Sequence, residues 1–144
     1  MKFLILNGPN LNLLGLREPA IYGRETYEDL RVLVLSTAAR LGLTADLYQS
    51  NHEGALVDAI QAAYSVYDGI VFNPAAYTHT SVALLDALKA VAIPTVEVHI
   101  SDVSKREDFR QVSYVRSACI ATITGHGLQG YAEAMELLKE HLSK

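Results

Sequence analysis

Gly69-Ile-Val-Phe-Asn-Pro74 indicates the fold class of the chain most directly, because every position between its glycine and its asparagine is apolar. A strand with one face in water alternates apolar and polar residues, whereas an unbroken apolar run indicates a strand buried on both faces. Pro74 has no backbone N–H to offer a neighbouring strand, so the run ends there. The sequence therefore predicts a short strand of a parallel sheet, with helices packed on both faces of that sheet.

Apolar runs of the same kind lie on both sides of this stretch and alternate with helical patterns. Besides 69–74, strands are predicted at residues 3–6, 43–49, 93–100 and 118–124. Helices are predicted to start near Thr26, near 51–54, at Val82 and after Gly130, where apolar residues recur at helical spacing. Five strands and four helices in 144 residues indicate one α/β domain, with a flavodoxin-like, doubly wound, five-stranded parallel sheet and helices on both faces.

Composition and charge argue against several classes of function. The formal net charge is −4 and no block of like charges occurs, which argues against a nucleic-acid-binding protein. No apolar run approaches the roughly 18 residues of a membrane span, and the first residues lack the apolar core of a signal peptide. The single cysteine, Cys119, has no partner for an internal disulfide, and its apolar neighbours predict a buried, unreactive thiol. We therefore expect a cytoplasmic protein with no nucleic-acid or membrane partner.

The longest polar connection runs from Asn7 to Tyr22 and does not lead directly into a helix. About 18 residues separate the first strand from the helix predicted near Thr26, and connections of that length are usually lids or binding loops. The loop carries Arg17 and Tyr22, five positions apart. Ligands of doubly wound sheets bind at the carboxyl ends of the strands, so we expect the site here. Polar residues are also concentrated at two other strand ends, 73–79 and 99–101.

Glu97 and His99 lie two positions apart in the predicted strand 93–100, so their side chains share one face. A charged group inside a parallel sheet is unfavourable without a partner. A carboxylate beside an imidazole can fix the tautomer of the ring and favour its charged form. Two interpretations stay open from the residues alone: a catalytic histidine beside an acid, or a polar pair that only satisfies itself. His79 precedes a helix and is equally compatible with chemistry, capping or packing.

Tyr22 can act as a base only if its pKa falls. The ordinary pKa of tyrosine is about 10, so a base working near pH 7–8 needs a shift of roughly 2–3 units, or about 3–4 kcal/mol. A guanidinium in a closed loop with little water can supply that shift, and Arg17 shares the loop. The alternative is that the Tyr22 ring only packs within the loop as an apolar group. The residues by themselves leave both interpretations, catalytic base and packing residue, open.

The polar residues near the predicted strand ends favour a small anionic, hydroxylated substrate and acid–base chemistry without a cofactor. Arginine suits carboxylate or phosphate groups, and backbone N–H groups that follow a strand can bind an anion. The candidate residues are Asn10, Arg17, Tyr22, Asn73, His79, Glu97, His99, Ser101, Arg106 and Arg110. The histidines and Glu97 have no recognisable metal-ligand spacing, so no metal is expected. The segment 125–130 matches GxGxxG but lacks the further strand and acid of dinucleotide-binding folds.

Several segments, taken in order, resemble type II 3-dehydroquinate dehydratase. The resemblance covers nearly the whole chain, and several of its motifs are specific. The segments are Asn7-Gly-Pro-Asn-Leu-Asn-Leu-Leu-Gly15, Arg17-Glu-Pro19, Tyr22-Gly23, Asn73-Pro-Ala-Ala-Tyr-Thr-His-Thr-Ser81, Glu97-Val-His-Ile-Ser101, Arg106-Glu-Asp-Phe-Arg110 and Gly127-Leu-Gln-Gly-Tyr131.

The resemblance implies a lyase that removes water from 3-dehydroquinate to give 3-dehydroshikimate, in the shikimate pathway or in quinate breakdown. Elimination would be anti and would pass through an enolate, with no cofactor and no Schiff base. Tyr22, activated by Arg17, would be the base, and His99, oriented by Glu97, would be the general acid. Asn10 would hold a water that stabilises the enolate. Substrate contacts would come from Asn73, His79, Ile100, Ser101, Arg106, Arg110 and, from a neighbouring subunit, Asp86.

The same resemblance implies a lid at about residues 16–24 and a dodecamer of four trimers. One position departs from the family pattern, because Leu85 stands where many members have an arginine. That departure puts details of the trimer contact in doubt and leaves the chemistry untouched.

A different class of function is a non-catalytic flavodoxin-like module that binds a nucleotide or flavin at the same strand ends. It is less favoured, because the loop after the first strand has no Ser/Thr run for phosphate and the chain has no tryptophan to stack on a flavin. A receiver-domain switch is less favoured too, because the first strand ends in Asn7 without the acidic cluster that Mg²⁺ requires.

Overall fold

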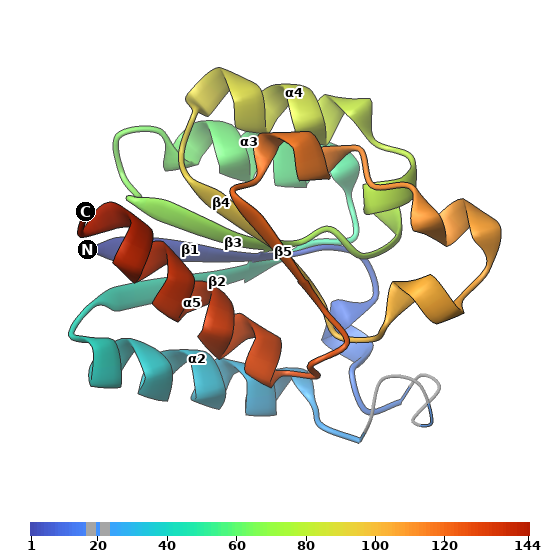
Figure 1. Ribbon diagram of the computed structural model, residues 1–144, viewed down its shortest axis with the longest axis horizontal. Helices are drawn as coiled ribbons and strands as arrows, with labels where there is room; N and C mark the ends of the chain where they lie inside the picture. The colour runs from blue at the N-terminus through green and yellow to red at the C-terminus, as the bar shows by residue number, and fades with distance from the viewer. Residues whose placement is uncertain (17–19, 21–23) are drawn as a thin grey trace.

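The chain forms the doubly wound α/β fold that its apolar strands predicted. The computed structural model describes residues 1–16, 20 and 24–144, and this part contains a five-stranded, all-parallel sheet with strand order β2-β1-β3-β4-β5 (Figure 1). That order is the one found in flavodoxin-like folds, so the predicted fold class is confirmed. The strands are β1 (Lys2–Asn7), β2 (Thr44–Gln49), β3 (Gly69–Asn73), β4 (Thr95–His99) and β5 (Ala121–Thr124).

Helices cover both faces of the sheet (Figure 1). The pair on one face is α2 (Tyr27–Leu41) and α5 (Gln129–Leu142), and the pair on the other is α3 (Glu53–Ala63) and α4 (Val82–Val91). Helix α2 starts where the sequence predicted, with Thr26 as its N-cap. Thr26 accepts a hydrogen bond from the backbone N–H of Asp29, and the Asp29 carboxylate accepts one from the N–H of Thr26. Ser81 caps α4 by accepting from the N–H of Leu84.

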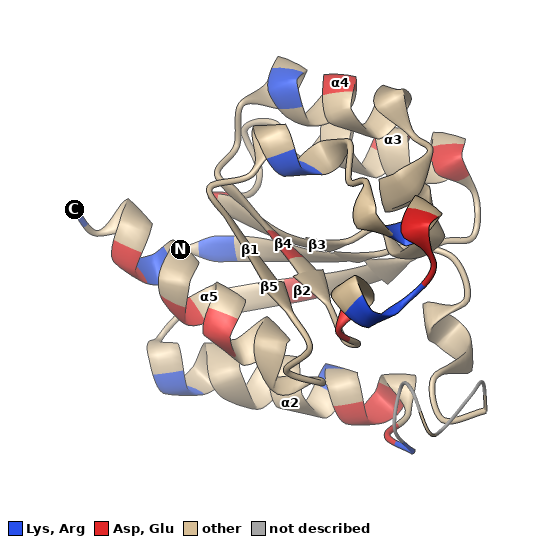
Figure 2. Cartoon of the chain, turned by 45° about the vertical axis from the view of Figure 1, so that its right-hand side comes forward, with Lys and Arg blue, Asp and Glu red and all other residues tan. Residues whose placement is uncertain are grey.

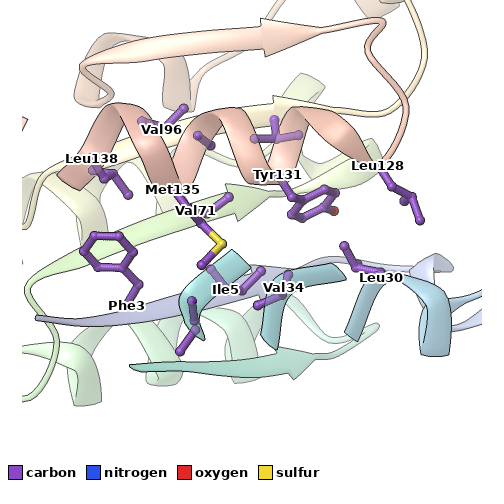
Figure 3. Packing of buried hydrophobic residues seen from close by; sticks show 14 of the residues in the cluster. Phe3, Ile5, Leu30, Val34, Val71, Val96, Leu128, Tyr131, Met135 and Leu138 are labelled. Atoms are coloured by element: carbon purple, nitrogen blue, oxygen red, sulfur yellow. The ribbon is translucent and has the colours of Figure 1, made fainter. Parts of the chain in front are cut away.

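Buried apolar side chains fill the space between the sheet and each pair of helices. Along β1, Phe3 and Ile5 point toward α2 and α5, whereas Leu4 and Leu6 point toward α3 and α4. Figure 3 shows the first of these layers, where Tyr131 and other side chains of α5 pack between the sheet and α2. Because helices cover both faces, alternate residues of a strand enter different apolar layers, which explains the unbroken apolar runs in the sequence.

Strand β5 begins at Ala121, later than the predicted start at Ala118. Val115–Ala118 forms a 3-10 helix instead, because a short apolar run does not by itself distinguish a strand from a turn. Cys119 follows that turn and donates its S–H to the carbonyl oxygen of Val115. Its side chain is partly buried, which corrects the expectation of full burial, and this burial raises the pKa of the thiol to about 12. The thiol is therefore a poor nucleophile, as expected.

Gly130, in the first turn of α5, lets that helix approach the sheet closely. A Cβ added to Gly130 would lie 3.3 Å from Cγ2 of Ile123 and 3.4 Å from Cγ1 of Val98. In the described part of the chain, no helix has both the length and the apolar character needed to cross a membrane. The lid expected at about residues 16–24 falls mostly outside the described residues.

The carboxyl ends of β1 and β3 are held together by a close backbone contact. The N–H of Gly8 donates to the carbonyl oxygen of Asn73 at 2.8 Å, and a Cβ added to Gly8 would lie 2.3 Å from the carbonyl oxygen of Pro74. No side chain fits that space without moving the backbone. The two segments that leave these strands therefore start from a fixed relative position.

Gly8→Ala is expected to lower the free energy of unfolding by about 1–3 kcal/mol, the usual cost of overpacking. The measurement is chemical denaturation of the variant and the parent protein. Gly54→Ala is the matched control, because Gly54 lies in α3 and an added Cβ there meets nothing within 4 Å. The control should be neutral or stabilising by up to about 1 kcal/mol. Equal stability of the Gly8→Ala variant and the parent would contradict the close contact.

Candidate active site

A pocket lies at the carboxyl ends of β1, β3 and β4, where the sequence predicted a site. The chain leaves β1 and β3, which are neighbours in the sheet, toward helices on opposite faces, and such a switch point is the usual ligand position in doubly wound folds. The polar residues that line the pocket are Asn10, Asn73, His79, His99, Ser101, Arg106 and Arg110, and Ile100 lines it as well. Most of the predicted site residues therefore converge in one place.

Glu97 and His99 form a buried pair on β4. The side chain of Glu97 is 0% exposed and that of His99 is 6% exposed. As predicted, the two side chains lie on the same side of the strand, and Nε2 of His99 is hydrogen-bonded to Oε2 of Glu97. Figure 2 shows most charged residues on helices and loops, whereas β4 carries an acidic position inside the sheet. Because His99 also lines the pocket, its imidazole connects the buried carboxylate to the pocket.

Glu97 also accepts hydrogen bonds from four side chains that did not figure among the candidates read from the sequence, counted over the described residues. The guanidinium of Arg116 donates to both carboxylate oxygens, through Nε at 3.2 Å and Nη2 at 3.3 Å. Hydroxyl donors complete the set: Ser113 at 2.8 Å, Thr78 at 3.2 Å and Thr122 at 3.4 Å. The sequence indicated only that a buried carboxylate requires a positively charged partner. It did not indicate that Arg116 is that partner.

The surroundings of Glu97 keep it ionised. Burial by itself would raise the pKa of the carboxyl group, but the hydrogen bond and charge of His99, with the hydrogen bonds from Arg116 and Ser113, lower it to about 2. Burial of a carboxylate is favourable only when charge-assisted hydrogen bonds replace the lost water, and this site provides them. The carboxylate therefore stays negative beside the imidazole over the whole physiological pH range.

Asn10 also lines the pocket, and hydrogen bonds from outside the pocket hold its backbone conformation. It has a φ of 70°, in the left-handed region, where asparagine is tolerated better than most residues. Its N–H donates to Oδ1 of Asn51 at 2.9 Å. Gln49 braces the same turn, because its Nε2 donates to Oδ1 of Asn51 at 3.2 Å and to the carbonyl oxygen of Gly8 at 3.1 Å. Neither Gln49 nor Asn51 was a candidate from sequence.

His79 and Arg110 form a third part of the wall. Nδ1 of His79 lies 2.7 Å from the carbonyl oxygen of Val112, and its ring meets Phe109 edge to face. Burial lowers the pKa of His79, and the charges of His99 and Arg110 lower it further, so the neutral ring is favoured. Arg110 donates through Nε to the carboxylate of Glu107 at 2.6 Å. Its guanidinium therefore lies at the pocket with a fixed partner on one side.

Four of the expected site residues are not among those that line the pocket. Glu97 lies behind His99 and reaches the pocket only through that ring. Arg17 and Tyr22 lie outside the described residues. Asp86 lies on α4 with its side chain exposed, and it is absent from the pocket wall of this single chain. Over residues 1–16, 20 and 24–144, no group of three or more His, Cys, Asp or Glu side chains has the arrangement of a metal site.

Comparison with known proteins gives consistent results over nearly the full chain. The family model described as "Dehydroquinase class II" matches residues 1–139. A 3-dehydroquinate dehydratase of Clostridium acetobutylicum is 49% identical over 144 residues, which is 100% of each chain. One from Corynebacterium glutamicum is 54% identical over 137 residues, covering 95% of this chain and 94% of the relative. The crystal structure of a type II dehydroquinase from Butyrivibrio crossotus superposes with a TM-score of 0.95 at 50% identity, covering 96% of this chain and 97% of the other.

The ionised Glu97 predicts a specific dependence of stability on pH. The pKa of Glu97 in the folded protein is below the ordinary value of 4.5. The ionised carboxylate therefore stabilises the folded state above pH 4.5, and this stabilisation is lost as the pH falls toward 2. A shift of this size corresponds to about 3 kcal/mol. Urea denaturation at pH 7, 4 and 3 should show that Glu97→Gln loses less stability on acidification than the parent protein does.

Glu140→Gln is the control, since Glu140 is an exposed carboxylate of α5 and its removal should leave the acid-induced loss unchanged. An equally steep loss in the Glu97→Gln variant and the parent protein would show that Glu97 is not the group whose protonation destabilises the fold.

Proposed function

The chain belongs to the class II dehydroquinase family, and from this premise we propose that it removes water from 3-dehydroquinate by anti elimination through an enolate, with no Schiff base. The product is 3-dehydroshikimate, made in the shikimate pathway or in quinate breakdown. The observation that carries the mechanism is the buried Glu97–His99 pair, which meets the pocket at the carboxyl end of β4. Such a pair can deliver a proton to a leaving group, which this elimination requires.

His99 is the general acid of this proposal. The leaving hydroxyl group departs with the electron pair of its C–O bond, and the imidazolium of His99 supplies the proton that makes it water. Glu97 orients the ring through a carboxylate that several donors keep ionised. Support for this assignment comes from the position of His99, which is almost fully buried and yet lines the pocket.

Tyr22 is the base, and Arg17 lowers its pKa. The phenolate takes the proton from the carbon next to the ketone, and the electrons of that C–H bond form the enolate. The enolate then re-forms the ketone as the C–O bond breaks, so no external electron pair or cofactor is needed. Asn10 holds a water that donates to the enolate oxygen. The fixed left-handed turn at Asn10 supports this role, since it presents the residue to the pocket.

The remaining residues bind the substrate. Asn73 and the backbone N–H groups of Ile100 and Ser101 hold the carboxylate. His79 and Arg110 hold the ring hydroxyls, with Arg106 nearby. Their convergence at the carboxyl ends of β3 and β4 supports these assignments. Arginine-rich pockets are suited to a small anion, in agreement with the charge of 3-dehydroquinate.

The proposal extends to the assembly. The chain acts as one catalytic domain within a dodecamer of four trimers in the cytoplasm, and Asp86 reaches the pocket of a neighbouring subunit. The exposed position of Asp86 on α4 is compatible with a contact of that kind. Leu85, the departure from the family pattern, lies beside it in the sequence and would alter the detail of that contact.

An ultraviolet assay of 3-dehydroquinate tests the reaction, because the product is a conjugated enone. We expect turnover that survives treatment with borohydride in the presence of substrate, since an enolate route has no imine to reduce. Loss of activity only when substrate and borohydride are present together would indicate a lysine imine, with Lys105 of the segment that follows β4 as the first candidate. No turnover by folded protein would favour a non-catalytic binding module instead.

Tyr22→Phe tests the base. The variant should lose at least about 100-fold in kcat, because general base catalysis contributes on that scale or more, while the fold and the binding of product remain. The measurements are steady-state kinetics and titration with 3-dehydroshikimate. Tyr64→Phe is the control, since Tyr64 is 65% exposed and does not line the pocket. Near-normal turnover by the Tyr22→Phe variant would remove Tyr22 from the role of base.

A further inference from the structure

Behind Asn73, on the side of the sheet covered by α2 and α5, lies a chain of buried polar groups that the reaction described above does not use. Tyr131 of α5 is 0% exposed and sits among apolar side chains (Figure 3). Nδ2 of Asn73 lies 2.9 Å from its hydroxyl oxygen, and that oxygen lies 2.6 Å from Oδ1 of Asn7. Asn7 in turn lies 3.5 Å, through Nδ2, from the hydroxyl oxygen of Tyr27.

One backbone group sets the directions of the hydrogen bonds that link Asn73, Tyr131 and Asn7. The N–H of Ala75 can only donate, and it points to one end of the Asn73 amide at 3.0 Å, so that end is Oδ1. The other end is then Nδ2, which donates to the oxygen of Tyr131. The hydroxyl of Tyr131 consequently gives its own proton to Oδ1 of Asn7, the shortest bond of the set. Burial raises the pKa of Tyr131, so the phenol keeps that proton.

These hydrogen-bond directions determine which group of the Asn73 side chain is available to the pocket. The amide nitrogen has two hydrogens, and the bond to Tyr131 uses one of them. Among the described residues the second hydrogen has no acceptor, and Asn73 lines the pocket. A reversed amide would place its oxygen against the hydroxyl of Tyr131 and its nitrogen against the N–H of Ala75, and that N–H would then have no acceptor. A buried N–H without an acceptor costs about 1–3 kcal/mol, so the reversed orientation is disfavoured.

We propose that Tyr131 is a positioning residue for substrate binding: together with the N–H of Ala75, which sets the orientation of the Asn73 amide, it holds that amide so that one N–H faces the pocket, and it thereby selects an acceptor such as a carboxylate at that position. The inference rests on the proposed function, since the carboxylate is that of 3-dehydroquinate. It adds a residue of α5, far from β3 in the sequence, to the determinants of specificity. Tyr131 acts only through Asn73 and touches neither the substrate nor the reacting atoms.

Tyr131→Phe is the test, because it keeps the ring in the apolar layer and removes only the hydroxyl. With Nδ2 of Asn73 no longer held, the KM for 3-dehydroquinate should rise about tenfold, the effect of roughly one hydrogen bond to a charged group. Glu97 and His99 lie on the face of β4 opposite to the layer that holds Tyr131, so kcat should stay within about twofold and the pH profile of kcat should not move. A purely structural role would lower stability and leave KM unchanged.

Tyr27→Phe is the matched control, since it removes the hydroxyl at the far end of the same chain, where the contact is longest. Its KM should equal that of the parent protein. Should Tyr131→Phe not fold, the double variant Asn7→Ala/Tyr131→Phe removes both partners of the 2.6 Å bond, so the buried Oδ1 of Asn7 is not left without its donor. It should show the same rise in KM.

An unchanged KM in the folded Tyr131→Phe or double variant would overturn the inference, as would an equal rise in Tyr27→Phe. The parent protein separates this outcome from a failure of the proposed function. If the parent does not dehydrate 3-dehydroquinate, the reaction is wrong; if the parent turns over and the variant keeps its KM, only the role of Tyr131 is wrong.

Discussion

The burial of one carboxylate organises this structure more than any other interaction. Glu97 is fully buried in β4 between Phe72 of β3 and Thr122 of β5, and it is stable there only because hydrogen-bond donors surround it. Those donors come from segments that follow β3 and β4 and from the edge strand β5. The loops around the pocket therefore have a definite conformation for an electrostatic reason. The imidazole of His99 is placed by the same requirement, between that carboxylate and the pocket.

A second buried polar side chain of the sheet, that of Asn73, has its hydrogen-bond partner on a helix. The other residues of β3 are apolar on both faces of the strand. The amide of Asn73 donates a hydrogen bond to the hydroxyl of Tyr131, which lies in the layer of α2 and α5. Because side chains alternate along β3 and β4, Asn73 belongs to the layer of α2 and α5, whereas Glu97 faces α3 and α4. The pocket at the carboxyl ends of the strands is therefore lined by polar side chains from both layers, Asn73 from one and His99 from the other.

The sequence predicted what depends on local pattern. Unbroken apolar runs predicted the strands, their order along the chain predicted the parallel sheet, and the strand ends predicted the pocket that contains Asn73 and His99. It did not predict Arg116 or Tyr131, because their partners lie 19 and 58 residues away and only the folded chain brings them together. The start of β5 was wrong for a related reason, since packing and not periodicity makes residues 115–118 a turn. The roles of Arg17 and Tyr22 stay predictions.

The separation of the two polar groups by the sheet has a consequence for how such an enzyme can change. In the described part of the chain, the hydrogen-bond partners of Asn73 and those of Glu97 form sets with no member in common. Substitutions in one set should therefore combine additively with substitutions in the other. Ligand recognition and proton delivery are then two nearly independent traits, encoded in opposite layers of one fold, and selection can alter either without first rebuilding the other.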